Sequence, residues 1–105
     1  MQEYEVRRGH FKHIEGDNLR ELMVEIFGNA EESEGKFVCR FGAISKLTAW
    51  SENGLLYIET EMNKDVDDDT AQKTIKAYNQ FLERATGFTS KQRRDRLQKK
   101  AKRGM

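Results

Sequence analysis

Proline is absent from the 105-residue sequence, and cysteine occurs once, as Cys39. Without proline, glycines and small polar residues must form the turns, because they adopt the tight backbone conformations that turns require. A single cysteine excludes an intrachain disulfide. The sequence also lacks an apolar run long enough to span a bilayer, an apolar segment near Met1 and an Asn-x-Ser/Thr glycosylation acceptor. These absences favour a soluble cytoplasmic protein with no membrane partner.

Acidic residues are scarce at the end of the chain. Residues 91–105 contain eight basic side chains and one acid, Asp95, so this segment carries a formal charge of +7. Residues 1–90 contain 11 basic and 17 acidic side chains and carry −6, and the overall charge of +1 hides this separation. A basic segment attached to an acidic domain indicates a polyanionic partner, of which nucleic acid is the commonest.

Hydrophobic periodicity divides the rest of the chain into short elements. Alternating apolar residues predict strands over 4–8, 36–41, 44–52 and 55–63. Asn53-Gly54 is the strongest short hairpin signal and joins the last two strands. The acidic and small residues 29–35 predict a surface loop.

Two segments have a helical period instead. The first predicted helix covers 18–27, with a capping box at Asn18 and Glu21 and a stop at Gly28. The second covers 69–86 and ends before Gly87. Its apolar stripe consists of Ala71, Ile75, Tyr78, Leu82 and Ala85.

The element order predicts the fold class. A β-α-β-β-β-α order indicates an α+β two-layer sandwich, with two helices on one face of a four-stranded, mainly antiparallel sheet. We expect residues 1–88 to form this domain and residues 89–105 to form a basic C-terminal helical arm. Thr89 and Gln92 have capping-box spacing at the start of the arm, and Phe88 is expected to pack back against the end of the second helix.

The basic arm is the first candidate site. A run of Lys and Arg attracts RNA or DNA because each neutralised phosphate releases condensed counterions, and arginine forks grip phosphate oxygens in pairs. The arm lacks the broad apolar face that a membrane-surface helix needs. Two other interpretations stay open: a strap on an acidic surface of its own domain or of a partner, and a solvated tail. The expected nucleic-acid contacts are Lys91, Arg93, Arg94, Arg96, Lys99, Lys100, Lys102 and Arg103.

The face of the sheet that the helices leave open is the second candidate. If Leu56 and Ile58 point toward the helices, Tyr57 points the other way. One of the two alternating residue sets of the neighbouring strands joins Tyr57 there, so Arg40 and Trp50 are possible contacts. Such a face can stack nucleic-acid bases, and it can equally bury itself against a second copy of the chain.

No motif points to catalysis or to a metal site. Aspartates alternate in the run 65–69 like the first ligands of an EF-hand loop, but the glycine and glutamate of such a loop are missing, so helix capping explains them. His10 and His13 have a spacing that zinc accepts, yet Cys39 is expected to point into the core. We therefore expect no catalytic residues, no metal and no cofactor.

Three strand segments carry a resemblance to a known family: Tyr4-Glu5-Val6-Arg7-Arg8-Gly9, Gly42-Ala43-Ile44-Ser45-Lys46-Leu47 and Leu56-Tyr57-Ile58-Glu59-Thr60. In these segments the chain resembles a family of small, uncharacterised archaeal proteins, a domain of unknown function. The resemblance implies a two-layer α/β sandwich of TATA-binding-protein-like or helix-grip topology. It brings no functional residues, and because this chain has one such unit and no evident pair of intercalating phenylalanines, it does not imply DNA binding through the sheet.

Together these patterns predict a non-enzymatic binding module whose basic arm contacts nucleic acid, with RNA slightly preferred over DNA. The alternative is a protein-interaction module that dimerises through the open sheet face, with the arm strapped on an acidic surface. The two hypotheses differ in salt dependence, because phosphate contacts weaken steeply with salt and an apolar dimer interface does not.

Overall fold

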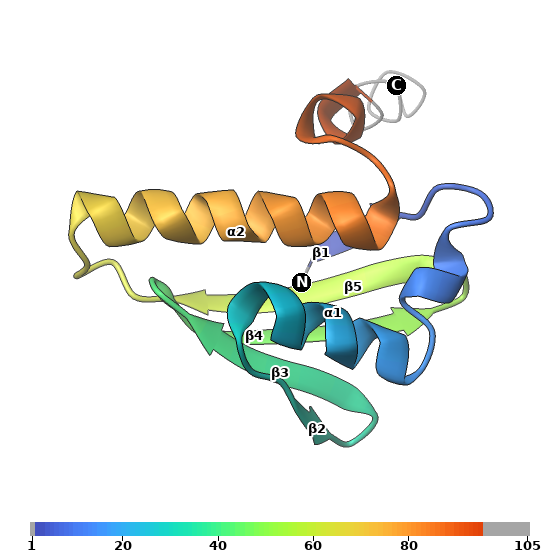
Figure 1. Cartoon of the computed structure of the whole chain (residues 1–105), viewed down its shortest axis with the longest axis horizontal. Helices are drawn as coiled ribbons and strands as arrows, with labels where there is room; N and C mark the ends of the chain where they lie inside the picture. Colours follow the sequence, from blue (N-terminus) through green and yellow to red (C-terminus); the bar gives the residue numbers. More distant parts are fainter. Residues whose placement is uncertain (1, 96–105) are drawn as a thin grey trace.

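A computed structural model describes residues 2–95 of the chain (Figure 1). Seven of its elements form the domain, a short 3-10 helix η1 (Phe11–His13) follows the first strand, and residues 90–95 are helical. In chain order the seven are β1 (Gln2–Glu5), α1 (Asp17–Phe27), β2 (Glu31–Ser33), β3 (Lys36–Phe41), β4 (Ile44–Glu52), β5 (Leu55–Met62) and α2 (Asp68–Thr86).

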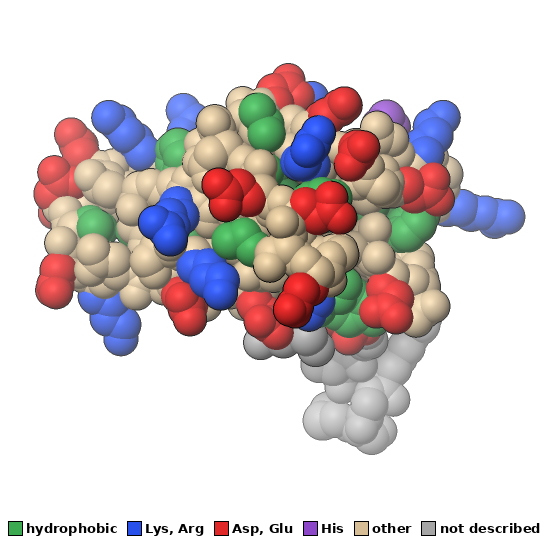
Figure 2. Space-filling model, turned by 90° about the horizontal axis from the view of Figure 1, so that it is seen from below, with side chains coloured by type: hydrophobic (Ala, Val, Ile, Leu, Met, Phe, Trp, Pro, Cys, Tyr) green, Lys and Arg blue, Asp and Glu red, His purple; other side chains and the backbone are tan. Residues whose placement is uncertain are grey.

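All five strands join one sheet in the order β1-β5-β4-β3-β2, and every neighbouring pair is antiparallel. Both helices pack on one face of this sheet (Figure 1), and Figure 2 shows the side of the molecule turned away from α2. The predicted α+β two-layer class is confirmed, as is the Asn53-Gly54 turn between β4 and β5, where both residues have positive φ. Among residues 2–95, no helix is long and apolar enough to cross a membrane.

The prediction of four strands is wrong, because part of the expected loop 29–35 forms β2. All three residues of β2 are exposed and polar, so the sequence has no apolar alternation that would predict the strand. The pairing of β2 with β3 depends on the turn between them: Glu34 and Gly35 both have positive φ, 53° and 80°, and close a tight hairpin. Asn29 extends this edge, since its side chain bonds the backbone N–H and carbonyl of Arg40 at 3.0 and 2.8 Å.

The first strand lies earlier than the predicted 4–8. Pairing with β5 stops at Glu5, and two residues later the backbone N–H of Arg7 donates to the carbonyl of Thr86 at 2.7 Å. The chain therefore leaves the sheet to contact the end of α2, which alternation in the sequence cannot reveal.

The helices begin and end close to the predicted positions. Gly28 and Gly87 end α1 and α2 in left-handed conformations, as predicted. The capping box predicted for α1 is wrong: Gly16 occupies the N-cap, and the Asn18 side chain donates to the carbonyl of Lys12 at 2.8 Å. For α2, the carboxylate of Asp67 accepts the N–H of Thr70 at 2.8 Å and caps the helix.

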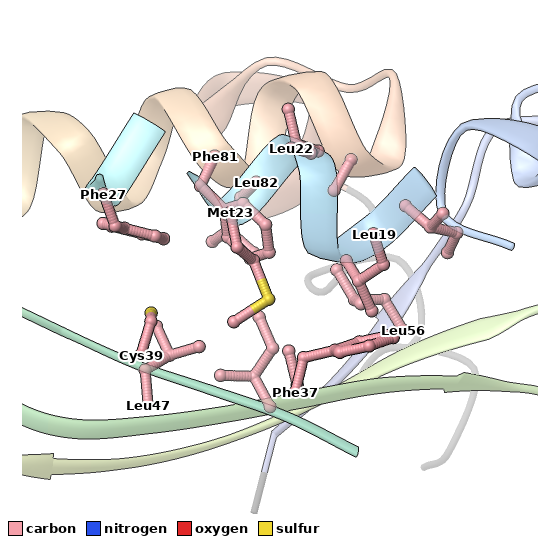
Figure 3. Packing of buried hydrophobic residues seen from close by; sticks show 14 of the residues in the cluster. Leu19, Leu22, Met23, Phe27, Phe37, Cys39, Leu47, Leu56, Phe81 and Leu82 are labelled. Atoms are coloured by element: carbon pink, nitrogen blue, oxygen red, sulfur yellow. The ribbon is translucent and has the colours of Figure 1, made fainter. Parts of the chain in front are cut away.

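The core lies between the two helices and the sheet. Figure 3 shows Leu19, Met23 and Phe27 of α1 beside Phe81 and Leu82 of α2, all pointing toward the sheet. The strands contribute the side chains that meet them from below, namely Phe37, Cys39, Leu47 and Leu56. Cys39 is 2% exposed, as its alternation with phenylalanines predicts, and this burial raises the pKa of its thiol to about 12.

The buried face of α2 differs from the predicted stripe. Ile75 is 59% exposed, whereas Thr74 and Thr86 are buried. Their hydroxyls are satisfied inside the protein: Thr86 donates to the carbonyl of Leu82 at 2.6 Å, and Thr74 bridges two backbone groups. Because these threonines are paired, burying them costs little, and the helix turns Ile75 outward.

Candidate functional site

The basic arm starts with a capping box, as predicted. The N–H of Thr89 donates to the Gln92 side chain at 2.9 Å, and the N–H of Gln92 donates to the Thr89 hydroxyl at 3.2 Å. These reciprocal bonds satisfy two otherwise unpaired donors at the start of helix 90–95. Lys91 and Arg94 are exposed on this turn, so both are accessible to a phosphate.

Arg93 has a different role from its basic neighbours. It is 8% exposed, and its guanidinium donates to the carbonyl of Phe88 at 2.6 Å and to the side chain of Asn79 at 3.4 Å. Burial lowers the pKa of Arg93, which the nearby Tyr4, Glu83 and Tyr78 partly offset. We therefore correct the prediction for this residue: Arg93 anchors the arm to α2 and is not available as a nucleic-acid contact.

Replacing Arg93 by methionine is expected to lower the free energy of unfolding by about 1–3 kcal/mol, because its hydrogen bonds to the carbonyl of Phe88 and to the side chain of Asn79 would be lost. Urea unfolding of the full chain measures this cost. The matched control is Arg94→Met, which removes the same charge from an exposed neighbour and should stay within about 0.5 kcal/mol of the parent chain. Equal costs for the two variants would contradict the anchoring role.

The other predicted arm contacts lie outside the described residues. These are Arg96, Lys99, Lys100, Lys102 and Arg103. The described part of the arm therefore contains one buried arginine and two exposed basic residues, and the rest of its positive charge follows in the sequence.

The open sheet face carries the three residues predicted for it, two of them in contact and Arg40 toward the other end of β3. Register places Trp50 opposite Tyr57, and their rings stack with centroids 5.5 Å apart and planes at 10°. Arg40 lies on the same face of β3, because it follows Cys39, which points into the core. Trp50 and Tyr57 are half-buried, whereas Arg40 is exposed.

Sequence reasoning missed the cation that lies on the aromatic pair. The ammonium Nζ of Lys36 is 4.1 Å from the centre of the Trp50 ring, a cation–π contact. The pairing of Phe37 with Ala49 brings Lys36 next to Trp50, so the signal was the register between β3 and β4. That register shifts at an irregularity between Cys39 and Phe41, and such bulges have no reliable sequence signature.

The same face is acidic overall. In the described sheet, register and alternation give it three basic residues, Lys36, Arg40 and Lys46. They also give it six glutamates, Glu3, Glu5, Glu31, Glu52, Glu59 and Glu61. Figure 2 shows red and blue side chains interspersed on the side turned away from α2, with few hydrophobic ones between them. Its net negative charge repels phosphates, so the face is poorly suited to stacking the bases of a nucleic acid.

A polar hollow of about 430 Å³ lies between η1, α1 and α2. His10 and His13 lie in it with ring centroids 4.3 Å apart, and Nε2 of His10 is 2.7 Å from the carbonyl of Arg84. Arg84 in turn pairs with Glu25 at 2.8 Å across the helices, which lowers the pKa of Glu25. His10 thus links this segment to α2, with His13 against its ring, which their spacing in the sequence did not predict.

Within residues 2–95, no group of three or more histidine, cysteine or acidic side chains is placed to hold a metal ion. In the acidic run 65–69, Asp67 caps α2 as the capping interpretation predicts. Its bonds to Thr70 lower the pKa of the Asp67 carboxyl.

Comparison with known proteins identifies a family. The family described as "Domain of unknown function (DUF5611)" matches residues 1–99. No curated protein and no solved structure matches the chain. The match covers the sheet, both helices and the described part of the arm, which is nearly the whole sequence. The chain therefore belongs to the DUF5611 family.

Proposed function

We propose that this chain is a non-enzymatic module that binds nucleic acid, RNA in preference to DNA, through its basic C-terminal arm. The observation that carries the proposal is the charge separation, with +7 in residues 91–105 against −6 in residues 1–90. A segment of that density neutralises several phosphates at once, and counterion release makes such binding favourable without base contacts.

The anchored start of the arm supports this proposal. The capping box and the buried Arg93 hold the first helical turn against α2, while Lys91 and Arg94 stay exposed. Figure 1 shows this turn on the side of α2 away from the sheet. Because the glutamates of the open sheet face repel phosphates, nucleic acid is expected along the arm. A cytoplasmic location and the archaeal origin that the resemblance implies complete the proposal.

The test is binding of fluorescent single-stranded RNA, duplex RNA and duplex DNA to the full chain at two salt concentrations. Four to six phosphate contacts would give a log–log salt slope of about −2.8 to −4.2 on single strands and about −3.6 to −5.4 on duplex DNA. Relative affinities then show whether RNA is preferred. Absence of salt-sensitive binding to all three ligands would refute the proposal.

A protein-interaction module is the second candidate function. The stacked Trp50 and Tyr57 favour it, since no described element covers this large aromatic surface. A dimer held mainly by apolar contacts fits less well, because charged side chains surround the pair.

A further inference from the structure

The aromatic pair on the open sheet face is built to hold a cation. Trp50 and Tyr57 present parallel rings, and Lys36 already places its ammonium 4.1 Å from the Trp50 ring centre. The negative face of an aromatic ring attracts such groups, and arginine stacks on it best. A basic side chain from outside could therefore stack on the exposed part of this pair, with Lys36 displaced to one side.

Carboxylates frame the aromatic pair. Glu3 lies opposite Tyr57 across the β1–β5 pairing, and Glu52 follows Trp50 by two residues on the same face. Partial burial and these two carboxylates raise the pKa of Tyr57. Glu59 pairs with Thr48 one step further along the sheet. The surface around the rings thus combines a stacking platform with negative charge.

We propose that this aromatic and acidic face binds the basic segment 91–103 of a second copy of the chain, through its basic side chains other than the anchored Arg93. The occupant is argued from charge: six glutamates against three basic residues on the described face, and seven basic residues besides Arg93 against one acid in the segment. Lys and Arg side chains of the segment stack on Trp50 and Tyr57 and pair with the surrounding glutamates.

The geometry favours a second copy over the same chain. Helix 90–95 lies on the side of α2 away from the sheet (Figure 1), so α2 and the sheet both separate the start of the arm from its own open face. A neighbouring copy imposes no such path, because the chain does not fix its orientation relative to the arm. Two copies that exchange arms reciprocally form a closed dimer with two-fold symmetry.

Docking of the segment on a second copy does not require nucleic acid, but it affects nucleic-acid binding. A segment docked on a neighbour's sheet cannot contact phosphates at the same time. Nucleic acid is therefore expected to compete with dimer formation, since both use the positive charge of residues 91–103.

The test uses Trp50, the one tryptophan of the sequence, as its probe. A synthetic peptide of residues 91–103 is titrated into the full chain, diluted until light scattering gives a monomer mass, while Trp50 fluorescence is followed. We expect a saturable change in emission, with an affinity about tenfold weaker at 300 mM than at 50 mM salt, because exposed ion pairs are screened. A peptide with its Lys and Arg replaced by glutamine is the control and should leave the emission unchanged.

Charge-reversed variants locate the site. The variant Glu52→Lys/Glu59→Lys should lose the peptide response and give a monomer mass by light scattering at low salt, where the parent chain is expected to be a dimer. The matched control, Glu15→Lys/Glu21→Lys, changes two exposed glutamates outside the open face and should behave like the parent chain. Circular dichroism of both variants checks that they are folded.

Two results would overturn this inference. One is a parent chain that is monomeric at low salt with unchanged Trp50 emission on adding the peptide. The other is a dimer that persists at high salt or in the Glu52→Lys/Glu59→Lys variant, since its interface would lie elsewhere. Adding single-stranded RNA to the dimer separates this inference from the proposed function: dimerisation without RNA binding refutes only the latter, and RNA binding by a chain that never dimerises refutes only the former.

Discussion

Replacing Lys99, Lys100, Lys102 and Arg103 by glutamine is expected to weaken binding of single-stranded RNA by roughly two to three orders of magnitude at about 0.1 M salt. Each phosphate contact on a single strand adds about −0.7 to the log–log salt slope, which corresponds to about fivefold in affinity at this salt concentration. Four lost contacts should therefore also reduce the steepness of the slope by about 2.8. Fluorescence anisotropy over a salt series measures both quantities.

The control changes the same number of charges on the body of the protein. Lys12, Lys46, Lys64 and Lys73 are exposed, and replacing all four by glutamine gives a chain with the same net charge as the arm variant. RNA affinity should then fall by less than about threefold, because these side chains act only through the distant field. Similar losses in both variants would mean that net charge, and not the arm, attracts RNA.

Replacing Gly42 by alanine is expected to lower the free energy of unfolding by about 2–4 kcal/mol, the largest effect of any small change that we predict. Gly42 lies in the turn between β3 and β4 with a φ of +51°, where alanine is strained by about 1–2 kcal/mol. Its Cβ would also collide with the hydroxyl of Thr74. That hydroxyl accepts the N–H of Ala43 at 2.8 Å and donates to the carbonyl of Thr70 at 2.7 Å, so it cannot turn away without losing both bonds.

A double-mutant cycle separates collision from backbone strain. In a Thr74→Ala background the hydroxyl is gone, and Gly42→Ala should cost only the strain of about 1–2 kcal/mol. Gly54→Ala is the matched control, since Gly54 has a φ of +78° and no atom within 4 Å of an added Cβ. Chemical denaturation of the four chains of the cycle gives the coupling. A cost for Gly42→Ala equal to that for Gly54→Ala would show that Thr74 does not restrict the turn.

Most of the fold follows from local patterns in the sequence. The strands β3, β4 and β5 have apolar alternation and a hairpin signal at Asn53-Gly54, and α1 and α2 have helical periods that end at glycines. The missed strand, β2, has neither, because its exposed residues owe their conformation to a turn at Glu34-Gly35 and to pairing with β3. Tertiary pairing decides such an element, and the sequence of three polar residues does not.

The candidate site was less predictable than the fold. Arg93 and its neighbour Arg94 have the same side chain. Arg93 is buried because the Phe88 carbonyl and Asn79 lie within its reach, whereas Arg94 is exposed. Ile75 was expected on the buried face of α2, because a periodicity based on apolar residues does not count threonine. Thr74 is buried there instead, with its hydroxyl hydrogen-bonded to the backbone. The contact between Trp50 and Tyr57 could be predicted from the sequence, since the register of the hairpin at Asn53-Gly54 places the two residues opposite each other.

The buried Arg93 has a consequence for how the molecule approaches a partner. By fixing the start of the arm on the side of α2 opposite the sheet, it separates the onset of positive charge from the glutamates of the open face by the thickness of the domain. Such a separation gives the described part of the protein an electric dipole moment. In the field of a long polyanion the dipole experiences a torque, so the protein rotates arm-first before any contact forms. Orientation before collision raises the fraction of encounters that succeed, and thus the association rate, even where the final affinity is modest.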